Sequence, residues 1–198
     1  MKNRKLYKIT VVSVFSALSA ILYMYLKFPL PFMFPSFLDI QLSTLPAIII
    51  TLMFSKYEGI SVIILKTLIK LLIQGTTSAY IGELGDIILG VAVVLALSKN
   101  LKKGIIKALI YSCITWVIAA AIINYFILVP TYIKLYFNDN VSNFIKTLKI
   151  LPNVNENNYM ILYLLLSVIP FNIILSSLVS FLSFIIYKRI PIIYEDNI

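Results

Sequence analysis

Long runs of hydrophobic residues alternate with short polar segments along the whole chain. A helix that crosses a bilayer needs about 20 mostly apolar residues, and the runs are of this order, although the second and third are short. The pattern therefore predicts an all-α integral membrane protein with six transmembrane helices in one bundle. We expect these helices at 7–26, 44–56, 59–74, 80–98, 105–130 and 159–187.

The composition supports this class. Hydrophobic residues make up 61% of the 198 positions and the mean hydropathy is +0.98, whereas a soluble domain is nearer 45–50% apolar. At this length we expect five to seven spans and a single membrane domain over residues 1–198, with no room for a separate soluble domain.

The basic residues suggest an orientation. The net charge is +9, which in a soluble protein would point to nucleic acid, but here topology explains it without a nucleic-acid partner. With six spans, both termini lie on one side, and the positive-inside rule makes the side with the basic excess cytoplasmic. That side would hold Lys2, Arg4, Lys5, Lys8, Lys56, Lys99, Lys102, Lys103, Lys107, Lys188 and Arg189, and the other would hold Lys27, Lys134, Lys146 and Lys149.

Four ionisable residues lie inside one hydrophobic hairpin, Ile60 to Gly90. Charges within membrane spans are costly and usually pair with one another inside the protein or face a watery cavity. Residues three or four apart share a helix face, and a fold about Thr76–Thr77 brings the two faces together. We therefore predict intramembrane pairs that join Lys70 to Glu83 and Lys66 to Asp86.

Two outer loops follow from this topology. The first, 27–43, reads KFPLPFMFPSFLDIQLS, and its prolines forbid a continuous helix. It either lies at the level of the lipid headgroups or forms a lid over a site between the helices. The second, 131–158, is the longest polar segment, and we expect a short amphipathic helix in it near Asn143 to Ile150.

Small residues recur at four-residue spacing in the first span, as Ser13 with Ala17 and Ser16 with Ala20. Such spacing lets two helices approach closely in lipid. The pattern fits packing inside the bundle or docking against a helix of a partner protein, and the sequence leaves both open.

Several kinds of chemistry have no residues to support them. The chain has no histidine and one cysteine, Cys113, and it lacks a GxxxxGK[ST] motif, so we expect no metal, no cofactor and no ATP hydrolysis by the P-loop route. Glu83 and Asp86 could form a catalytic carboxylate pair, but facing lysines favour a structural role. A transporter or receptor is our first hypothesis, with a small membrane enzyme acting on lipid, or a structural subunit without ligand, as alternatives.

Two asparagines lie toward the outer ends of the last two spans. Asn124 occurs in INYFILVP, and Asn172 in IPFNIILSS, two residues after Pro170. Amide side chains both donate and accept hydrogen bonds, which suits a neutral heterocycle, although they also join helices in membranes. With Glu83, Tyr80 and the aromatic first loop on the same side, they favour a small-molecule site.

The order and spacing of four segments resemble a known family, the substrate-binding S components of energy-coupling factor (ECF) transporters, and most closely its riboflavin-specific branch. The segments are FPLPFMFPSFLDIQLSTLPAII, GTTSAYIGELGDIILG, NYFILVPTY and PFN with a final YKRI. The resemblance implies a bacterial plasma-membrane protein that binds its vitamin outside. It also implies two kinds of partner, a transmembrane coupling protein and two cytoplasmic ATPases.

The same resemblance assigns roles to individual residues. Asn124 and Asn172 would contact the flavin ring, Glu83 would line the pocket, and a group in the first loop would close over it: Leu38, Ile40 and Thr44. The small residues Ser13, Ala17 and Ala20 would dock on the coupling protein.

Two positions depart from the riboflavin branch. That branch typically has a lysine where this chain has Leu175 and tends to have an asparagine where it has Asp86. Ser176, on the same helix face as Asn172, could supply a substitute hydroxyl. Riboflavin is the first choice of ligand, and a related flavin or another aromatic vitamin is the nearest alternative.

Overall fold

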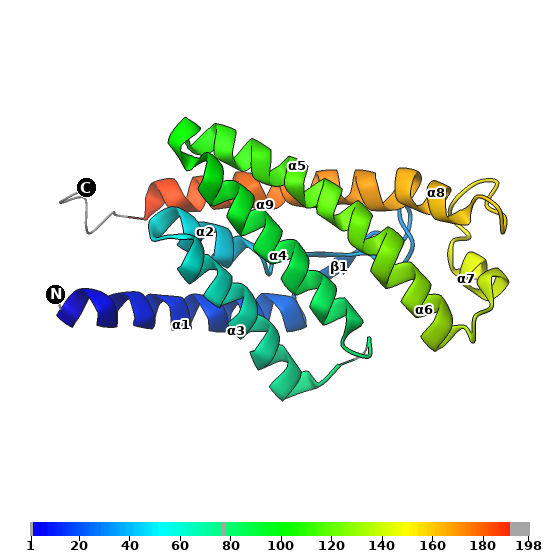
Figure 1. Ribbon diagram of the computed structural model, residues 1–198, viewed down its shortest axis with the longest axis horizontal. Coiled ribbons are helices and arrows are strands. Elements are labelled where there is room, and N and C mark those ends of the chain that lie inside the picture. Colours follow the sequence, from blue (N-terminus) through cyan, green and yellow to red (C-terminus); the bar gives the residue numbers. More distant parts are fainter. Residues whose placement is uncertain (1, 77, 191–198) are drawn as a thin grey trace.

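The computed structural model describes residues 2–76 and 78–190, so Thr77, at the expected hairpin tip, lies outside it. The chain folds into an elongated helical bundle in which α1 (Lys2–Tyr25) begins and α9 (Ile169–Arg189) ends at the same end of the molecule (Figure 1). Between them come α2 (Leu45–Met53), α3 (Lys56–Gln74), α4 (Ile81–Asn100), the short 3-10 turn η1 (Leu101–Lys103), α5 (Ile105–Ile123), α6 (Val129–Tyr136), α7 (Val141–Thr147) and α8 (Tyr159–Tyr163).

Within the described residues, four helical segments are long and apolar enough to cross a membrane. They are Arg4–Tyr25, Ile81–Lys103, Ile105–Tyr136 and Tyr159–Arg189. α3 has 19 residues but carries four charged side chains, and α2 has only nine residues. The protein is therefore a multi-pass membrane protein with at least these four spans, and the count of six and the side of the termini stay predictions.

α2 is the central element of the bundle. It packs against α1, α3, α4 and α9, and every residue from Leu45 to Thr51 is buried. Gly59 on α3 allows this packing, because a Cβ there would lie 2.0 Å from Oγ1 of Thr51. A nine-residue helix is about 14 Å long, which is too short to cross a bilayer by itself. The chain reaches α2 through the non-helical backbone that precedes Leu45.

The first outer loop supplies that backbone. Its strands β1 (Lys27–Pro29) and β2 (Asp39–Gln41) pair antiparallel, with Lys27 opposite Gln41. Phe34 is buried and packs edge-on against Phe171 of α9 at 5.4 Å between ring centres. The loop is thus folded back onto the helices, although Phe28, Phe32 and Met33 remain exposed.

Two helices run past a proline, and at the first of these, Pro130, the sequence predicts a boundary. The fifth span was expected to end at 130, but the helix continues through the π-helix η2 (Asn124–Leu128) into α6 and ends at Tyr136. A second π-helix, η3 (Leu164–Val168), precedes Pro170 in the same way. Proline removes a backbone donor, and the wider π turn before each proline lets the helix continue. The outer loop is therefore shorter than 131–158. It contains a short helix, α7, as predicted, and Phe144 is the buried residue of that helix.

Candidate ligand-binding site

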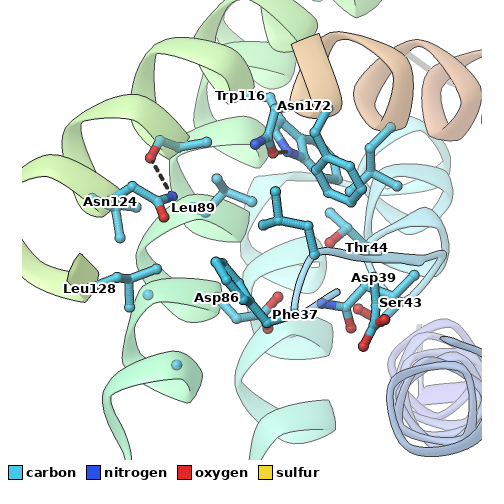
Figure 2. Close-up of a pocket in the computed structure, with 18 residues that line it drawn as sticks. Phe37, Asp39, Ser43, Thr44, Asp86, Leu89, Trp116, Asn124, Leu128 and Asn172 are labelled. Atoms are coloured by element: carbon cyan, nitrogen blue, oxygen red, sulfur yellow. Dashed lines mark hydrogen bonds between the residues drawn. The ribbon is translucent and has the colours of Figure 1, made fainter. Parts of the chain in front are cut away.

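A cavity lies between the first loop and α4, α5 and α9 (Figure 2). Its inner part has a volume of about 190 Å³, and it continues into an outer part of about 410 Å³. The inner part alone is below the range of about 300–1,000 Å³ that is usual for small-ligand sites, and the two together reach it. Side chains common to both parts are Phe37, Leu38, Asp39, Gln41, Asp86, Asn124 and Leu128.

The deep end of the cavity is aromatic. Trp116 of α5 and Phe171 and Asn172 of α9 line only the inner part. The indole N–H of Trp116 donates to Oδ1 of Asn172 at 3.0 Å, and Nδ2 of Asn172 donates to the Val168 carbonyl at 2.7 Å. Figure 2 shows Trp116 and Asn172 side by side. The asparagine is therefore held in one orientation by bonds on its oxygen and its nitrogen.

Asn124 is held in a parallel way. Its Nδ2 donates to the Ala120 carbonyl at 2.8 Å, and its Oδ1 accepts from the Tyr163 hydroxyl at 3.2 Å. A side-chain amide has two N–H groups and two oxygen lone pairs, so Asn124 and Asn172 each keep one donor and one acceptor for a ligand. The two amides are thus oriented in advance and still able to bind.

Lys66 joins four parts of the bundle at the wall of this cavity. Its side chain is fully buried, and Nζ lies 2.9 Å from Oδ2 of Asp86 on α4. Nζ also donates to the Ser43 hydroxyl at 3.0 Å and lies 5.2 Å from the centre of the Tyr23 ring on α1. The Ser43 carbonyl in turn accepts a hydrogen bond from Ser19. The predicted pair of Lys66 with Asp86 is present, and it also fixes the segment between β2 and α2.

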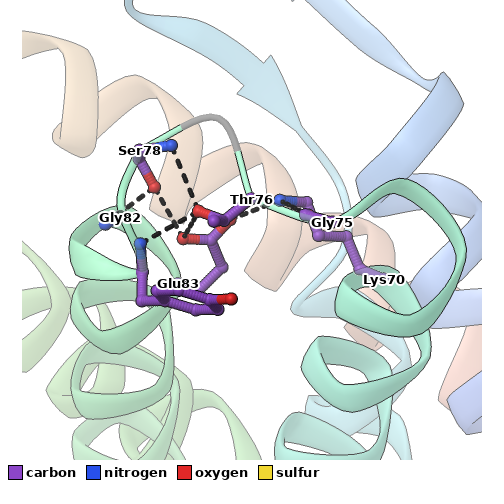
Figure 3. Close-up of polar contacts among 7 residues, drawn as sticks. Lys70, Gly75, Thr76, Ser78, Gly82 and Glu83 are labelled. Atoms are coloured by element: carbon purple, nitrogen blue, oxygen red, sulfur yellow. Dashed lines mark hydrogen bonds and ion pairs between the residues drawn. The ribbon is translucent and has the colours of Figure 1, made fainter.

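The second predicted pair organises the connection between α3 and α4 (Figure 3). Lys70 pairs with Glu83 and donates to the Gly75 carbonyl at 2.9 Å. The other carboxylate oxygen of Glu83 accepts from the hydroxyls of Thr76 and Ser78, at 3.1 and 2.6 Å. Both oxygens of this carboxylate thus hold the connection between α3 and α4 against the first turn of α4.

The structure therefore brings together part of the expected site. Leu38, Thr44, Asp86, Asn124, Asn172 and Leu175 line the cavity, whereas Ile40, Tyr80, Glu83 and Ser176 do not line either part of it. Ile40 alternates with Asp39 and Gln41 along β2 and faces the other side. Tyr80 precedes α4 in a left-handed conformation and is largely exposed, and the buried Ser176 hydroxyl bonds to the Ile173 carbonyl. Both acids form the ion pairs that the sequence predicted, but Asp86 and not Glu83 lines the cavity.

Other lining residues were not among the expected ones, and they include Phe37, Asp39, Gln41 and Trp116. The sequence contained a signal for Trp116, because Trp116, Ala120 and Asn124 follow one another at four-residue spacing and so share a helix face. For Asp39 and Gln41 the signal was the alternation of DIQ, which puts both on one side of a strand.

The small residues of α1 divide between two faces. Ser13 and Ala17 are exposed, while Ser16 and Ala20 are fully buried against the bundle. Packing inside the bundle thus accounts for Ser16 and Ala20, and docking of Ser13 and Ala17 on a partner stays a prediction. The structure does not place Ala20 on a face that a partner could reach, because its close packing is inside the chain.

The comparisons with known proteins decide the class. The sequence matches the family described as "ECF transporter, substrate-specific component" over residues 7–187. The chain belongs to this family. Its members are transport proteins and not enzymes, so Glu83 and Asp86 are not a catalytic pair, and each forms an ion pair with a lysine.

Individual known proteins are similar to this chain over most of its length. Riboflavin transporter RibU of Staphylococcus aureus is 28% identical over 92% of this chain and 89% of its own. Riboflavin transporter FmnP of Bacillus subtilis is 31% identical over 65% of this chain and 70% of its own. A solved structure of the S component of a bacterial ECF transporter covers 96% of each chain with 26% identity and a TM-score of 0.69.

The role of Lys66 leads to a first prediction. Lys66→Met leaves the Asp86 carboxylate without its cation, and breaking a buried pair in this way costs about 3–5 kcal/mol. We expect a large fall in the thermal unfolding temperature in detergent, and substantial recovery in Lys66→Met/Asp86→Asn, where neither charge remains. Lys149→Met, which removes an exposed lysine, is the control. Equal unfolding temperatures for Lys66→Met and this control would show that the pair does not hold the bundle together.

Proposed function

We propose that this S component binds riboflavin on the outer side of the membrane and delivers it for uptake. The observation that carries the proposal is the pair of oriented amides, Asn124 and Asn172, beside Trp116 and Phe171 at the deep end of the cavity. An isoalloxazine ring is flat, largely apolar and edged with both donors and acceptors, which fits this set. The names of the S. aureus and B. subtilis relatives support the same ligand.

The affinity would come from burial of the ring. Removal of apolar surface from water contributes roughly 25 cal/mol per Å², and the aromatic and aliphatic walls supply most of that contact. The two asparagines would set the orientation of the ring through the donor and the acceptor that each has free. Leu175 lines the wall where the riboflavin branch has a lysine, so one polar contact is replaced by an apolar one. A related flavin with a different polar edge is therefore the alternative ligand.

Transport needs partners in this proposal. The chain has no P-loop, so the energy would come from a transmembrane coupling protein and two cytoplasmic ATPases, which the family description supports in kind. The exposed face of α1 with Ser13 and Ala17 is the proposed docking surface. Six spans, with α2 and α3 added to the four apolar ones and both termini cytoplasmic in a bacterial plasma membrane, complete the proposal.

Titration of riboflavin fluorescence with purified protein tests the proposal. We expect riboflavin to bind, and Asn124→Ala and Asn172→Ala to weaken binding at least about tenfold, because each removes two hydrogen bonds worth roughly 1 kcal/mol apiece. Asn100→Ala is the matched control, since Asn100 also bonds to the carbonyl four residues earlier, 2.8 Å away, but lies outside the cavity. A protein that purifies without colour and binds no added riboflavin would refute the proposed ligand.

The first loop is proposed to act as the lid of the site. Phe37 lines both parts of the cavity and packs against Tyr163 at 6.0 Å between ring centres. We expect Phe37→Ala to speed riboflavin dissociation about tenfold in stopped-flow measurements, because the lid loses about the contact area of one ring. Phe32→Ala is the matched control, since Phe32 is in the same loop but lines neither part of the cavity. Equal dissociation rates for the two variants would mean that the loop does not retain the ligand.

A further inference from the structure

A groove of about 600 Å³ lies on the surface of the bundle at the start of α5. It is lined by Lys103 of η1 and by Lys107, Ile110, Tyr111 and Ile114 of α5. None of these residues lines either part of the ligand cavity. The turn between α4 and α5 lies at the end of the molecule where α1 begins and α9 ends (Figure 1), so the groove is a separate feature.

The groove lies where two membrane-spanning segments meet. The spans Ile81–Lys103 and Ile105–Tyr136 are separated by Gly104 alone, and the φ of +97° at this glycine is one that a residue with a side chain rarely adopts. Lysines near the end of a span extend toward the membrane–water boundary, and tyrosines are enriched there. The lysines and the tyrosine of the groove are therefore at the level expected for lipid headgroups.

The two lysines of the groove have no acidic partner in the described part of the chain. The sequence contains no aspartate or glutamate between Asp86 and Asp139, and neither Lys103 nor Lys107 is in any of the ion pairs of the described residues. Nζ of Lys103 lies 4.5 Å from the centre of the Tyr111 ring, a cation–π contact that holds this side chain over α5. The groove thus presents positive charge that matches a phosphate group.

The face of α5 that continues from the groove is apolar. Ile110 and Ile114 line the groove, and Ile118 and Ile122 extend the same face at four-residue spacing. Each of the four side chains is slightly more than half exposed. The distance from Ile110 to Ile122 along the helix is about 18 Å, which exceeds half of a hydrocarbon core of about 30 Å. An acyl chain can therefore pack along this stripe.

A lipid fits this face better than the proposed protein partner does. The proposed docking surface for that partner is on α1, and Figure 1 shows α1 and α5 on opposite sides of the bundle. α1 packs against α2 and α3, whereas α5 packs against α4 and α9. Lysines at the headgroup level beside an apolar stripe are complementary to a phosphate group joined to acyl chains, and bacterial membranes supply such molecules.

We propose that the groove binds an anionic phospholipid. Its phosphate lies between Lys103 and Lys107, and one acyl chain runs along Ile110 and Ile114. The inference is independent of the proposed riboflavin site and goes beyond it. A lipid bound in this way holds the turn between α4 and α5 at the headgroup level, on the side of the bundle opposite α1.

Native mass spectrometry of the purified protein in detergent tests the inference. The probes are phosphatidylglycerol, which is anionic, and phosphatidylcholine with the same acyl chains, which has no net charge. We expect the native protein to bind phosphatidylglycerol about tenfold more tightly, and Lys103→Gln/Lys107→Gln to lower this preference to about twofold. Lys99→Gln/Lys102→Gln is the matched control, because it removes two exposed lysines near the same turn that do not line the groove, and it should keep the preference.

Both double variants should unfold at the native temperature without added lipid, because their lysines are exposed, and both should bind riboflavin as the native protein does. Equal affinity of the native protein for the two lipids would overturn the inference, and so would an equal loss of preference in the two variants.

Two further outcomes would assign the groove to another ligand and so overturn the inference. Soluble glycerol phosphate that displaces phosphatidylglycerol at similar concentrations would show a site for free phosphate. A Lys103→Gln/Lys107→Gln protein that keeps the lipid preference but no longer binds the coupling protein would assign the groove to that protein.

Discussion

Two lysines buried among membrane helices must be neutralised, and the rest of the fold depends on how this is done. A charged side chain inside a bundle is tolerated only when it is paired and hydrogen-bonded. Lys66 and Lys70 lie one turn apart on α3, so their partners must lie one turn apart on the neighbouring helix, and Glu83 and Asp86 satisfy that on α4. The two pairs fix the register of α3 against α4.

The neutralisation of Lys66 also shapes the cavity. One carboxylate oxygen of Asp86 pairs with Lys66, and the Asp86 side chain also forms part of the cavity wall. The bond from Lys66 to Ser43 draws the end of the first loop into the bundle, where α2 begins as a short buried helix. Non-helical backbone at this depth is stable only where it is covered by protein or lines a cavity, and here it does both.

Much of this arrangement was predictable because helix periodicity is local. The spacing of Lys66, Lys70, Glu83 and Asp86 was enough to predict both pairs, and the resemblance of the segments was enough to predict the family. Which acid faces the cavity was not predictable, because it depends on where a third element, the loop at Ser43, packs against the hairpin. The run of helix past Pro130 was missed for a related reason, since the π turn that accommodates the proline leaves no clear mark in the composition.

A structure of the protein with riboflavin bound tests the central claim most directly. The proposed site predicts ring atoms within about 4 Å of Trp116 and Phe171 and hydrogen bonds from the ring edge to Asn124 and Asn172. A flavin bound on the outer surface of the loop, or between α1 and the lipid, with the cavity unchanged, would contradict it.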